Sequence, residues 1–203
     1  MCTMPTDQNS HADGRTARRS NNSDTALRSA IEIFAARGLV PTIETVAEYS
    51  GVSIRSLYRY FGDTQTMINE AINLMVSQAV LLGKIDNVGE GPLADRITAS
   101  VSGRFRAYHH LRPVLRVANP NDPEIDVVRR QARALLTAQF DLQFAQELSQ
   151  LDIAEREQTS QAGSAVCSLD FINLLNDRQP LSEDEAQKIV CRLLTQLFIP
   201  AAA

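Results

Sequence analysis

One segment, Thr42–Phe61, constrains the fold of this chain more than any other part of the sequence. It reads TIETVAEYSGVSIRSLYRYF and predicts two short amphipathic helices separated by a glycine turn. Ile43, Val46 and Ala47 recur at helical spacing, so one side of the first helix is apolar. Gly51 follows at the place where helices commonly end in a left-handed residue. The segment therefore predicts a helix, a tight turn and a second helix.

The ends and the inner side of the second helix are also marked in the sequence. Thr42 and Ser53 each stand just before a helical segment, where a hydroxyl can accept a hydrogen bond from a free backbone N–H. Leu57 and Phe61 follow at i, i+4 spacing and are expected to point inward. A two-helix unit with a short glycine turn suits a second helix that lies in a DNA major groove.

The outer side of the second helix carries hydroxyl, guanidinium and phenol groups. Arginine bound to O6 and N7 of guanine is the commonest specific base contact, whereas serine and tyrosine hydroxyls more often bind phosphate. A solvated helix face beside an apolar core is the alternative interpretation. The candidate DNA-binding residues are Thr42, Ser53, Ile54, Arg55, Ser56, Tyr58, Arg59, Tyr60 and Thr64.

This stretch resembles the DNA-binding helix-turn-helix of the TetR/AcrR family of bacterial repressors. The matching residues are Thr42, Val46, Ala47, the run Gly51-Val52-Ser53, Leu57, Tyr58 and the pair Tyr60-Phe61. The sequence departs from the family at Ser50, where alanine is usual, and at Thr64, where a lysine that contacts phosphate is usual. The resemblance implies base contacts for Ser53, Ile54, Arg55, Ser56 and Tyr58, and phosphate contacts for Thr42 and Tyr60.

Composition and charge fit a soluble helical protein that has one DNA-binding end. The chain has 203 residues, of which 44% are hydrophobic, and a net charge of −4. That charge argues against nonspecific coating of nucleic acid. Residues 1–62 contain seven arginines and six acidic residues, whereas residues 63–203 contain thirteen basic and eighteen acidic residues. Because no apolar run approaches ~18 residues and the N-terminus lacks an apolar signal core, we expect a cytoplasmic protein without a membrane span.

The periodicity predicts an all-α fold of about nine helices in three parts. Residues 1–20 are polar and aperiodic and predict a flexible N-terminal arm. Residues 21–65 form the expected helix-turn-helix domain, and residues 66–203 form the expected effector-binding and dimerisation domain. Pro113 is expected to limit a helix, while single helices are expected over about 123–148 and 152–176. Arg15, Arg18 and Arg19 in or beside the arm either bind DNA or belong to a solvated tail.

Two groups of apolar residues in the C-terminal part have functional interpretations that the resemblance supports. Stripes on the last two helices predict a four-helix dimer interface, with a monomer core as the alternative. The candidate interface residues are Val166, Leu169, Ile172, Ile189, Val190, Leu193 and Leu197. Aromatic residues on the middle helices are candidates for an effector pocket, with plain core as the alternative. These residues are Phe105, Tyr108, Phe140, Phe144 and Phe171.

The sequence thus favours a homodimeric transcriptional regulator, most simply a repressor that a small-molecule effector releases from an inverted-repeat operator. One alternative is a helical ligand-binding protein with weak or lost DNA binding. A second is a small hydrolase that uses Cys167 or a serine as nucleophile and His109 or His110 as base. The chain has no G-x-S-x-G elbow and no histidines at metal-ligand spacing. We therefore expect no enzymatic activity, no catalytic residues, no metal and no cofactor.

Cys2, Cys167 and Cys191 are expected to be reduced thiols.

Overall fold

The computed structural model describes residues 10–117, 123–179 and 181–198, and within these ranges it contains helices and no strand. The predicted all-α fold is confirmed. The chain divides into two compact units, Met1–Leu74 and Met75–Ala203. The helices are α1 Ser10–Arg37, α2 Ile43–Ser50, α3 Ile54–Phe61, α4 Thr64–Leu82, α5 Leu93–Val117, α6 Pro123–Gln143, α7 Ala145–Leu148, α8 Ile153–Val166, α9 Leu169–Asn173, the π-helical turn η1 Leu174–Arg178 and α10 Glu183–Phe198.

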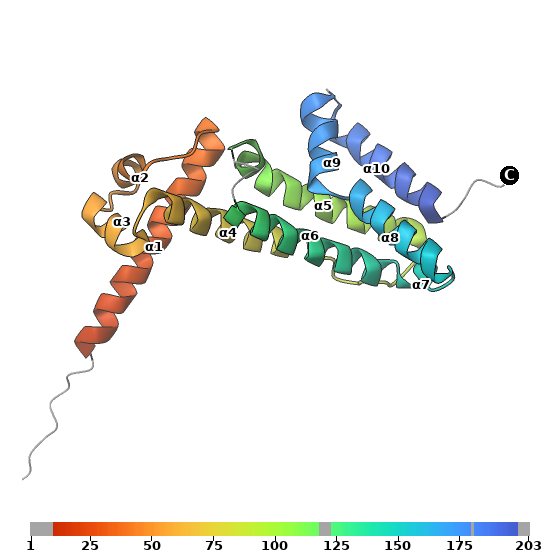
Figure 1. Ribbon diagram of the computed structural model, residues 1–203, viewed down its shortest axis with the longest axis horizontal. Helices are drawn as coiled ribbons and strands as arrows, with labels where there is room; N and C mark the ends of the chain where they lie inside the picture. Colours follow the sequence, from red (N-terminus) through yellow and green to blue (C-terminus); the bar gives the residue numbers. More distant parts are fainter. Residues whose placement is uncertain (1–9, 118–122, 180, 199–203) are drawn as a thin grey trace, which may run out of the picture. The chain divides into compact units, whose positions relative to one another are not determined.

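The N-terminal unit consists of α1, α2, α3 and the first part of α4 (Figure 1). Its helices are held together by apolar side chains that have lost nearly all contact with water. Burial of apolar surface is the dominant favourable term in folding. The central residues of this core are Ala26, Ala30, Phe34, Ile43, Val46, Leu57, Phe61, Met67 and Ala71. They include Ile43, Val46, Leu57 and Phe61, which were predicted to point inward, whereas Ala47 is only half-buried.

Helix α1 begins earlier than the sequence pattern suggested. The arm was expected over residues 1–20, but residues 10–20 lie within α1. Apolar periodicity gave no sign of this, because the first buried side chain of the described part is Ala26. Residues 1–9 of the expected arm lie outside the described residues. Helix α1 thus continues, as a polar helix, beyond the part that packs in the core.

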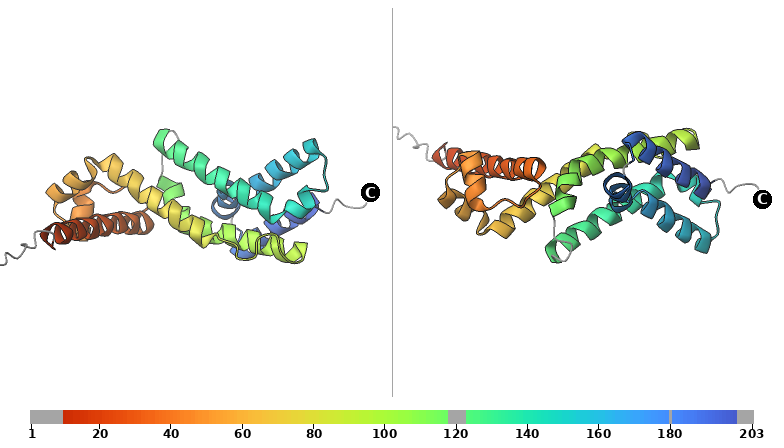
Figure 2. Two further views of the ribbon diagram at one scale, coloured as in Figure 1. Left: turned by 90° about the horizontal axis from the view of Figure 1, so that it is seen from below. Right: turned by 90° about the horizontal axis from the view of Figure 1, so that it is seen from above.

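The C-terminal unit is a bundle in which α10 packs along α5 and α8, and α6 packs along α8 (Figures 1 and 2). Ala186, Val190 and Leu194 recur every four residues on α10 and are fully buried. Asp177 in η1 binds the guanidinium groups of Arg112 and Arg116 on α5 at 2.7 and 3.1 Å. Every helix in the described ranges is too short or too polar to span a lipid bilayer.

Three helices differ in extent from the sequence prediction. The helix expected over 123–148 is divided into α6 and α7 at Phe144, whose φ of −115° is not helical. Pro113 lies inside α5 instead of ending it. A proline in a helix removes one N–H donor, here the one that would reach the carbonyl of His109, but this site is only half-buried, so water can replace the bond. The helix expected over 152–176 is interrupted because the hydroxyl of Ser168 accepts a hydrogen bond from the backbone N–H of Phe171 at 3.1 Å. That local bond starts a new helix.

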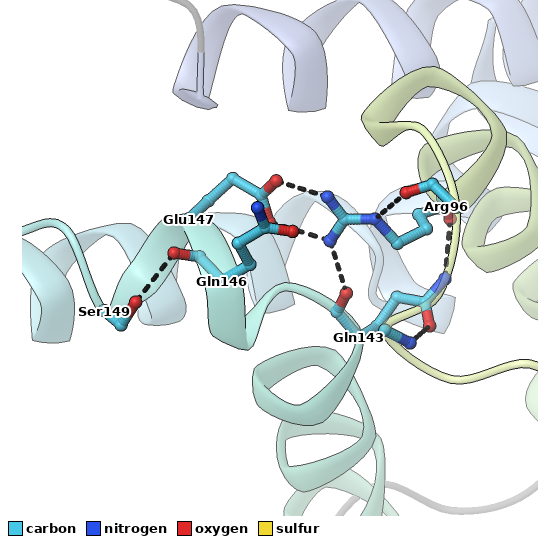
Figure 3. A network of polar contacts seen from close by, with 7 residues as sticks. Arg96, Gln143, Gln146, Glu147 and Ser149 are labelled. Carbon is cyan, nitrogen blue, oxygen red and sulfur yellow. Dashed lines mark hydrogen bonds and ion pairs between the residues drawn. The ribbon is translucent and has the colours of Figure 1, made fainter.

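A buried polar network ties the loop after α4 to α5, α6 and α7 (Figure 3). The Arg96 guanidinium forms a two-pronged ion pair with the Glu147 carboxylate, in which Nη1 lies 2.8 Å from Oε2. It also donates to the backbone carbonyls of Gln143 at 2.9 Å and Gly91 at 3.1 Å. The side-chain oxygen of Gln143 in turn accepts from the backbone N–H of Gly89 at 2.9 Å. The polar groups of this network therefore have hydrogen-bond partners, as is usual for polar groups in a protein interior.

Candidate functional site

The turn of the helix-turn-helix is built by two caps and one glycine. The Thr42 hydroxyl accepts from the backbone N–H of Thr45 at 3.3 Å and starts α2. Gly51 ends α2 with a φ of 71°, a conformation that side chains with a Cβ rarely adopt. The Ser53 hydroxyl then accepts from the backbone N–H of Ser56 at 3.3 Å and starts α3. Both caps and the glycine turn agree with the sequence prediction.

Helix α3 has one buried side and one side that faces solvent. Leu57 and Phe61 are buried in the unit's core. Ile54 and Tyr58, two large apolar side chains, are instead 44% and 46% exposed. The other candidates on and around α3 are either exposed, as Ser53, Arg55 and Arg59 are, or half-buried, as Ser56 and Tyr60 are. The structure thus places the predicted base-facing and phosphate-facing residues of α3 on one accessible surface.

Two further candidates lie at the N-termini of helices, which attract phosphate because their backbone N–H groups are unpaired. Thr42 caps α2 and is exposed, while Thr64 is the first residue of α4 and is half-buried. Asp63 already occupies the start of α4, since its Oδ1 accepts from the backbone N–H of Thr66 at 2.7 Å. This hydrogen bond lowers the pKa of Asp63. The carboxylate therefore offsets the attraction of this helix end for phosphate.

Tyr60 is surrounded by donors and cations, two of which come from α1. The Arg59 guanidinium lies 5.1 Å from the Tyr60 ring centre and donates to its hydroxyl at 3.2 Å. The Arg19 guanidinium lies 5.9 Å from the same ring centre. Hydrogen bonding from Asn22, followed by that from Arg59, lowers the pKa of Tyr60. Arg19 was left open in the sequence interpretation, and Asn22 was missed because a single polar residue in a polar helix carries no signal.

The same surface carries one acidic group that the sequence interpretation did not include. Glu44 is fully exposed in the first turn of α2 and hydrogen bonds with its own backbone N–H, with Thr42 and with Tyr58. These bonds, that to the backbone first, lower the pKa of Glu44. In the sequence Glu44 appears only as an acid that favours a helix N-terminus. In the structure it lies near the hydroxyl of Tyr58, and a carboxylate at this place can also accept from the amino group of cytosine.

The comparison with known protein families supports the same interpretation. Residues 26–71 match the model of the bacterial regulatory proteins of the tetR family. The match supports a tetR-family regulator. The match runs from the first buried residues of α1 into α4 and includes all of α2 and α3. It also supports a DNA-binding transcriptional regulator. No curated protein and no solved structure matches the chain.

The aromatic residues that were candidates for an effector pocket lie in the core of the C-terminal unit. Phe105, Tyr108, Phe140 and Phe144 are at most 1% exposed. The rings of Phe140 and Phe144 have centres 4.7 Å apart. Phe171 is half-buried and packs against the same core. These five residues therefore pack in the core of the C-terminal unit, as the alternative of a plain core expects, and none of them lines the cavity described next.

A cavity of about 190 Å³ lies elsewhere in the C-terminal unit. Gly83 lines it, and a Cβ on Gly103 would lie only 2.8 Å from the carbonyl oxygen of Gly83. The absence of side chains lets these two backbone segments approach closely. The lining residues come from α4, α5, α6, α9 and the turn after α4: Val76, Ala79, Val80, Gly83, Lys84, Ala107, Leu111, Ala132, Leu135, Leu136, Gln139 and Leu169.

The candidate dimer residues fall into two classes in the single chain. Ile172 and Val190 are fully buried in the core of their own unit. The others are half-buried, namely Val166, Leu169, Ile189, Leu193 and Leu197. Apolar residues at helical spacing predict that one face of a helix is buried. The spacing does not tell whether the same chain or a second chain covers that face. The half-buried residues are thus the ones whose remaining apolar surface is free for a second chain.

The residues named for the hydrolase alternative do not form a reactive group. Cys167 is a free thiol in the core, and burial raises its pKa to about 12. A thiol must ionise to act as a nucleophile, so this residue is inert at neutral pH. The His109 Nε2 lies 3.0 Å from Oε2 of Glu183 on α10. Cys191 is a half-buried free thiol, and Cys2 lies outside the described residues.

Proposed function

We propose that this protein is a homodimeric repressor that leaves an inverted-repeat operator when a small molecule occupies the cavity. The observation that carries the proposal is the accessible face of α3 within the tetR-family domain. Arg55 and Ser53 read base edges in the major groove, and Ile54 contacts a thymine methyl group. Tyr60 and Arg59, supported by Arg19, bind phosphate. Such a protein acts in the cytoplasm, where the bacterial chromosome lies.

A twofold dimer explains why the operator should be an inverted repeat. Each α3 must meet an equivalent half-site, and successive major grooves on one face of DNA lie roughly 34–36 Å apart. The half-buried apolar side chains of α8, α9 and α10 supply the surface for pairing. Ile189, Leu193 and Leu197 recur every four residues along α10, so they form a continuous stripe. Two such stripes would bury each other in the dimer.

The cavity can influence DNA binding through α4. Val76, Ala79 and Val80 line the cavity, while Met67 and Ile68 of the same helix lie in the core of the DNA-binding unit. A ligand that contacts the second half of α4 acts on a rigid element that continues into that unit. It weakens operator binding only to the extent that it binds the DNA-free state more tightly than the DNA-bound state.

The proposal is tested by measuring binding to a fluorescent duplex taken from the DNA that flanks the protein's own gene. We expect two chains per duplex, an affinity that falls steeply with salt, and weak binding to a shuffled duplex. Equal affinity for both duplexes at every salt concentration would instead favour the ligand-binding protein with lost DNA binding. That alternative gains some support from Glu44 and Asp63, the two carboxylates beside the predicted DNA contacts.

Leu193→Asp is expected to convert the dimer to a monomer, because it places a charge in the apolar stripe where an unpaired ion is costly. Sedimentation velocity measures the change, and circular dichroism verifies that the variant keeps its helices. Thr195→Asp is the matched control, since Thr195 is exposed on the same helix and receives the same charge. A folded Leu193→Asp variant that sediments as an unchanged dimer would contradict the proposed interface.

A further inference from the structure

The cavity in the C-terminal unit has mostly apolar walls and one charged residue. Nine of its twelve lining residues are alanine, valine or leucine, and the others are Gly83, Lys84 and Gln139. Gln139 uses its amide N–H to bind the carbonyl of Gly83 at 3.2 Å, which leaves its own oxygen as an acceptor. None of the lining residues is acidic. The cavity is therefore largely hydrophobic, and Lys84 is the charged residue among those that line it.

Lys84 lines the cavity, and its side chain is exposed. Arg106 donates through Nε to the carbonyl of Leu82 at 2.9 Å and through Nη2 to that of Lys84 at 3.5 Å. These bonds hold the turn that carries Lys84 and add a second cation close to it. The ion pairs between described residues include neither Lys84 nor Arg106.

A third cation lies behind the cavity wall. Arg104 is 3% exposed, and its Nη2 donates to the carbonyl of Leu136, a lining residue, at 2.6 Å. Its Nη1 is buried and has no hydrogen-bond partner. Burial lowers the pKa of Arg104, yet an arginine stays protonated in proteins. Cys167 is the neighbouring ionisable group, and its pKa of about 12 keeps it neutral.

A buried cation without a counter-charge is costly, and the three charged residues Lys84, Arg104 and Arg106 are all cations. We infer that the cavity binds a small apolar carboxylic acid, whose carboxylate meets Lys84 and offsets the charge of Arg104 while its hydrocarbon part fills the apolar walls. The inference rests on the proposed function only in taking this ligand as the effector.

The absence of tryptophan from the chain allows a clean binding measurement. Leu135 lines the cavity and is 57% exposed, so Leu135→Trp places a single fluorescent reporter at its edge. This protein is titrated with hexanoate and with hexanamide, which has the same shape but no charge. We expect hexanoate to bind about tenfold more tightly, because hydrogen bonds to charged groups are stronger than neutral ones. Calorimetry on the wild-type protein must give the same ranking.

Three methionine variants in the reporter background identify the source of the preference. Lys84→Met removes the ammonium group from an exposed side chain, and we expect it to reduce the preference for hexanoate to less than about threefold. Arg104→Met removes the buried cation and should have the same effect if the variant folds. Lys188→Met is the control, because Lys188 pairs with Asp184 on the surface of α10. It should leave the preference unchanged.

Equal affinity for hexanoate and hexanamide, or binding of neither, overturns the inference. So does an undiminished preference in folded Lys84→Met and Arg104→Met variants. The DNA-binding measurement is repeated with each ligand to separate the inference from the proposed function. If hexanoate binds with the expected preference but leaves operator affinity unchanged, the ligand class stands and the effector role fails. If both ligands bind equally and release DNA, the effector role stands and the inference of an acidic ligand fails.

Discussion

Replacing Arg96 with methionine is expected to lower the free energy of unfolding of the C-terminal unit by about 3–5 kcal/mol. The methionine fills much of the same space, so the loss comes from the polar network and not from a large cavity. Glu147 would keep a carboxylate whose side chain is only 17% exposed and has lost its guanidinium partner. The carbonyls of Gln143 and Gly91 would also lose their donors.

Urea unfolding followed by circular dichroism measures this change. The double variant Arg96→Met/Glu147→Met should recover a large part of the lost stability, because two apolar side chains leave no buried charge without a partner. Arg130→Met is the control, since Arg130 forms an exposed pair with Asp126 on α6 at 3.3 Å and such pairs contribute little. A loss of less than about 1 kcal/mol for Arg96→Met would show that this network does not hold the loop in place.

The ion pair between Arg96 and Glu147 also makes the stability of the C-terminal unit depend on pH, and the direction of this dependence can be worked out. Hydrogen bonding from Arg96 lowers the pKa of Glu147 below its usual value of 4.5. A carboxyl whose pKa is lower in the folded state stabilises the protein above the pKa of the unfolded state, and this stabilisation is lost as the pH falls through the folded pKa. The stability difference between the wild type and Arg96→Met should therefore be constant near neutral pH and shrink below about pH 4.5.

Gly163→Ala is expected to destabilise the C-terminal unit, although alanine is the better helix former. A Cβ at Gly163 would lie 2.0 Å from Cζ of Phe140, an unphysical distance. The ring of Phe140 cannot easily move away, because it is fully buried and lies against Phe144 and Phe198. Overpacking of this kind costs about 1–3 kcal/mol or more, which exceeds the gain of about 0.5–1 kcal/mol in helix propensity.

A double-mutant cycle with Phe140→Leu measures whether the clash is the cause. Leucine lacks the outer ring atoms that the new Cβ would meet, so Gly163→Ala should cost much less in the Phe140→Leu background than in the wild type. Ala162→Gly at the exposed neighbouring position reports the propensity effect alone. A Gly163→Ala variant as stable as the wild type would mean that α6 and α8 pack less closely than the structure shows.

The sequence predicts the DNA-binding unit well because its determinants are local. Thr42 and Ser53 cap helices through backbone groups three residues away, and Gly51 supplies a left-handed turn by its own conformation. The inward spacing of Leu57 and Phe61 needs only the geometry of one helix. These features can be deduced without knowing what the rest of the chain does.

The C-terminal unit is less predictable because its features depend on contacts between distant segments. The aromatic residues of α5 and α6 have the same helical spacing whether they line a cavity or fill a core, and only the partner helices decide. The cavity is lined by Gly83 and by small side chains such as Ala107 and Ala132, which come from different segments of the chain. Likewise, the position of Arg19 over Tyr60 depends on how α1 packs against α3.

The central claim, that the face of α3 reads an operator, is tested most directly by selecting bound duplexes from a randomised DNA library. The wild type should enrich an inverted repeat. Arg55→Ala should accept any base at one position of each half-site, at a cost of about 1–3 kcal/mol, whereas Tyr60→Phe should weaken all sites alike without changing the preference. An unchanged base preference in Arg55→Ala, or no enriched sequence for the wild type, would contradict the account.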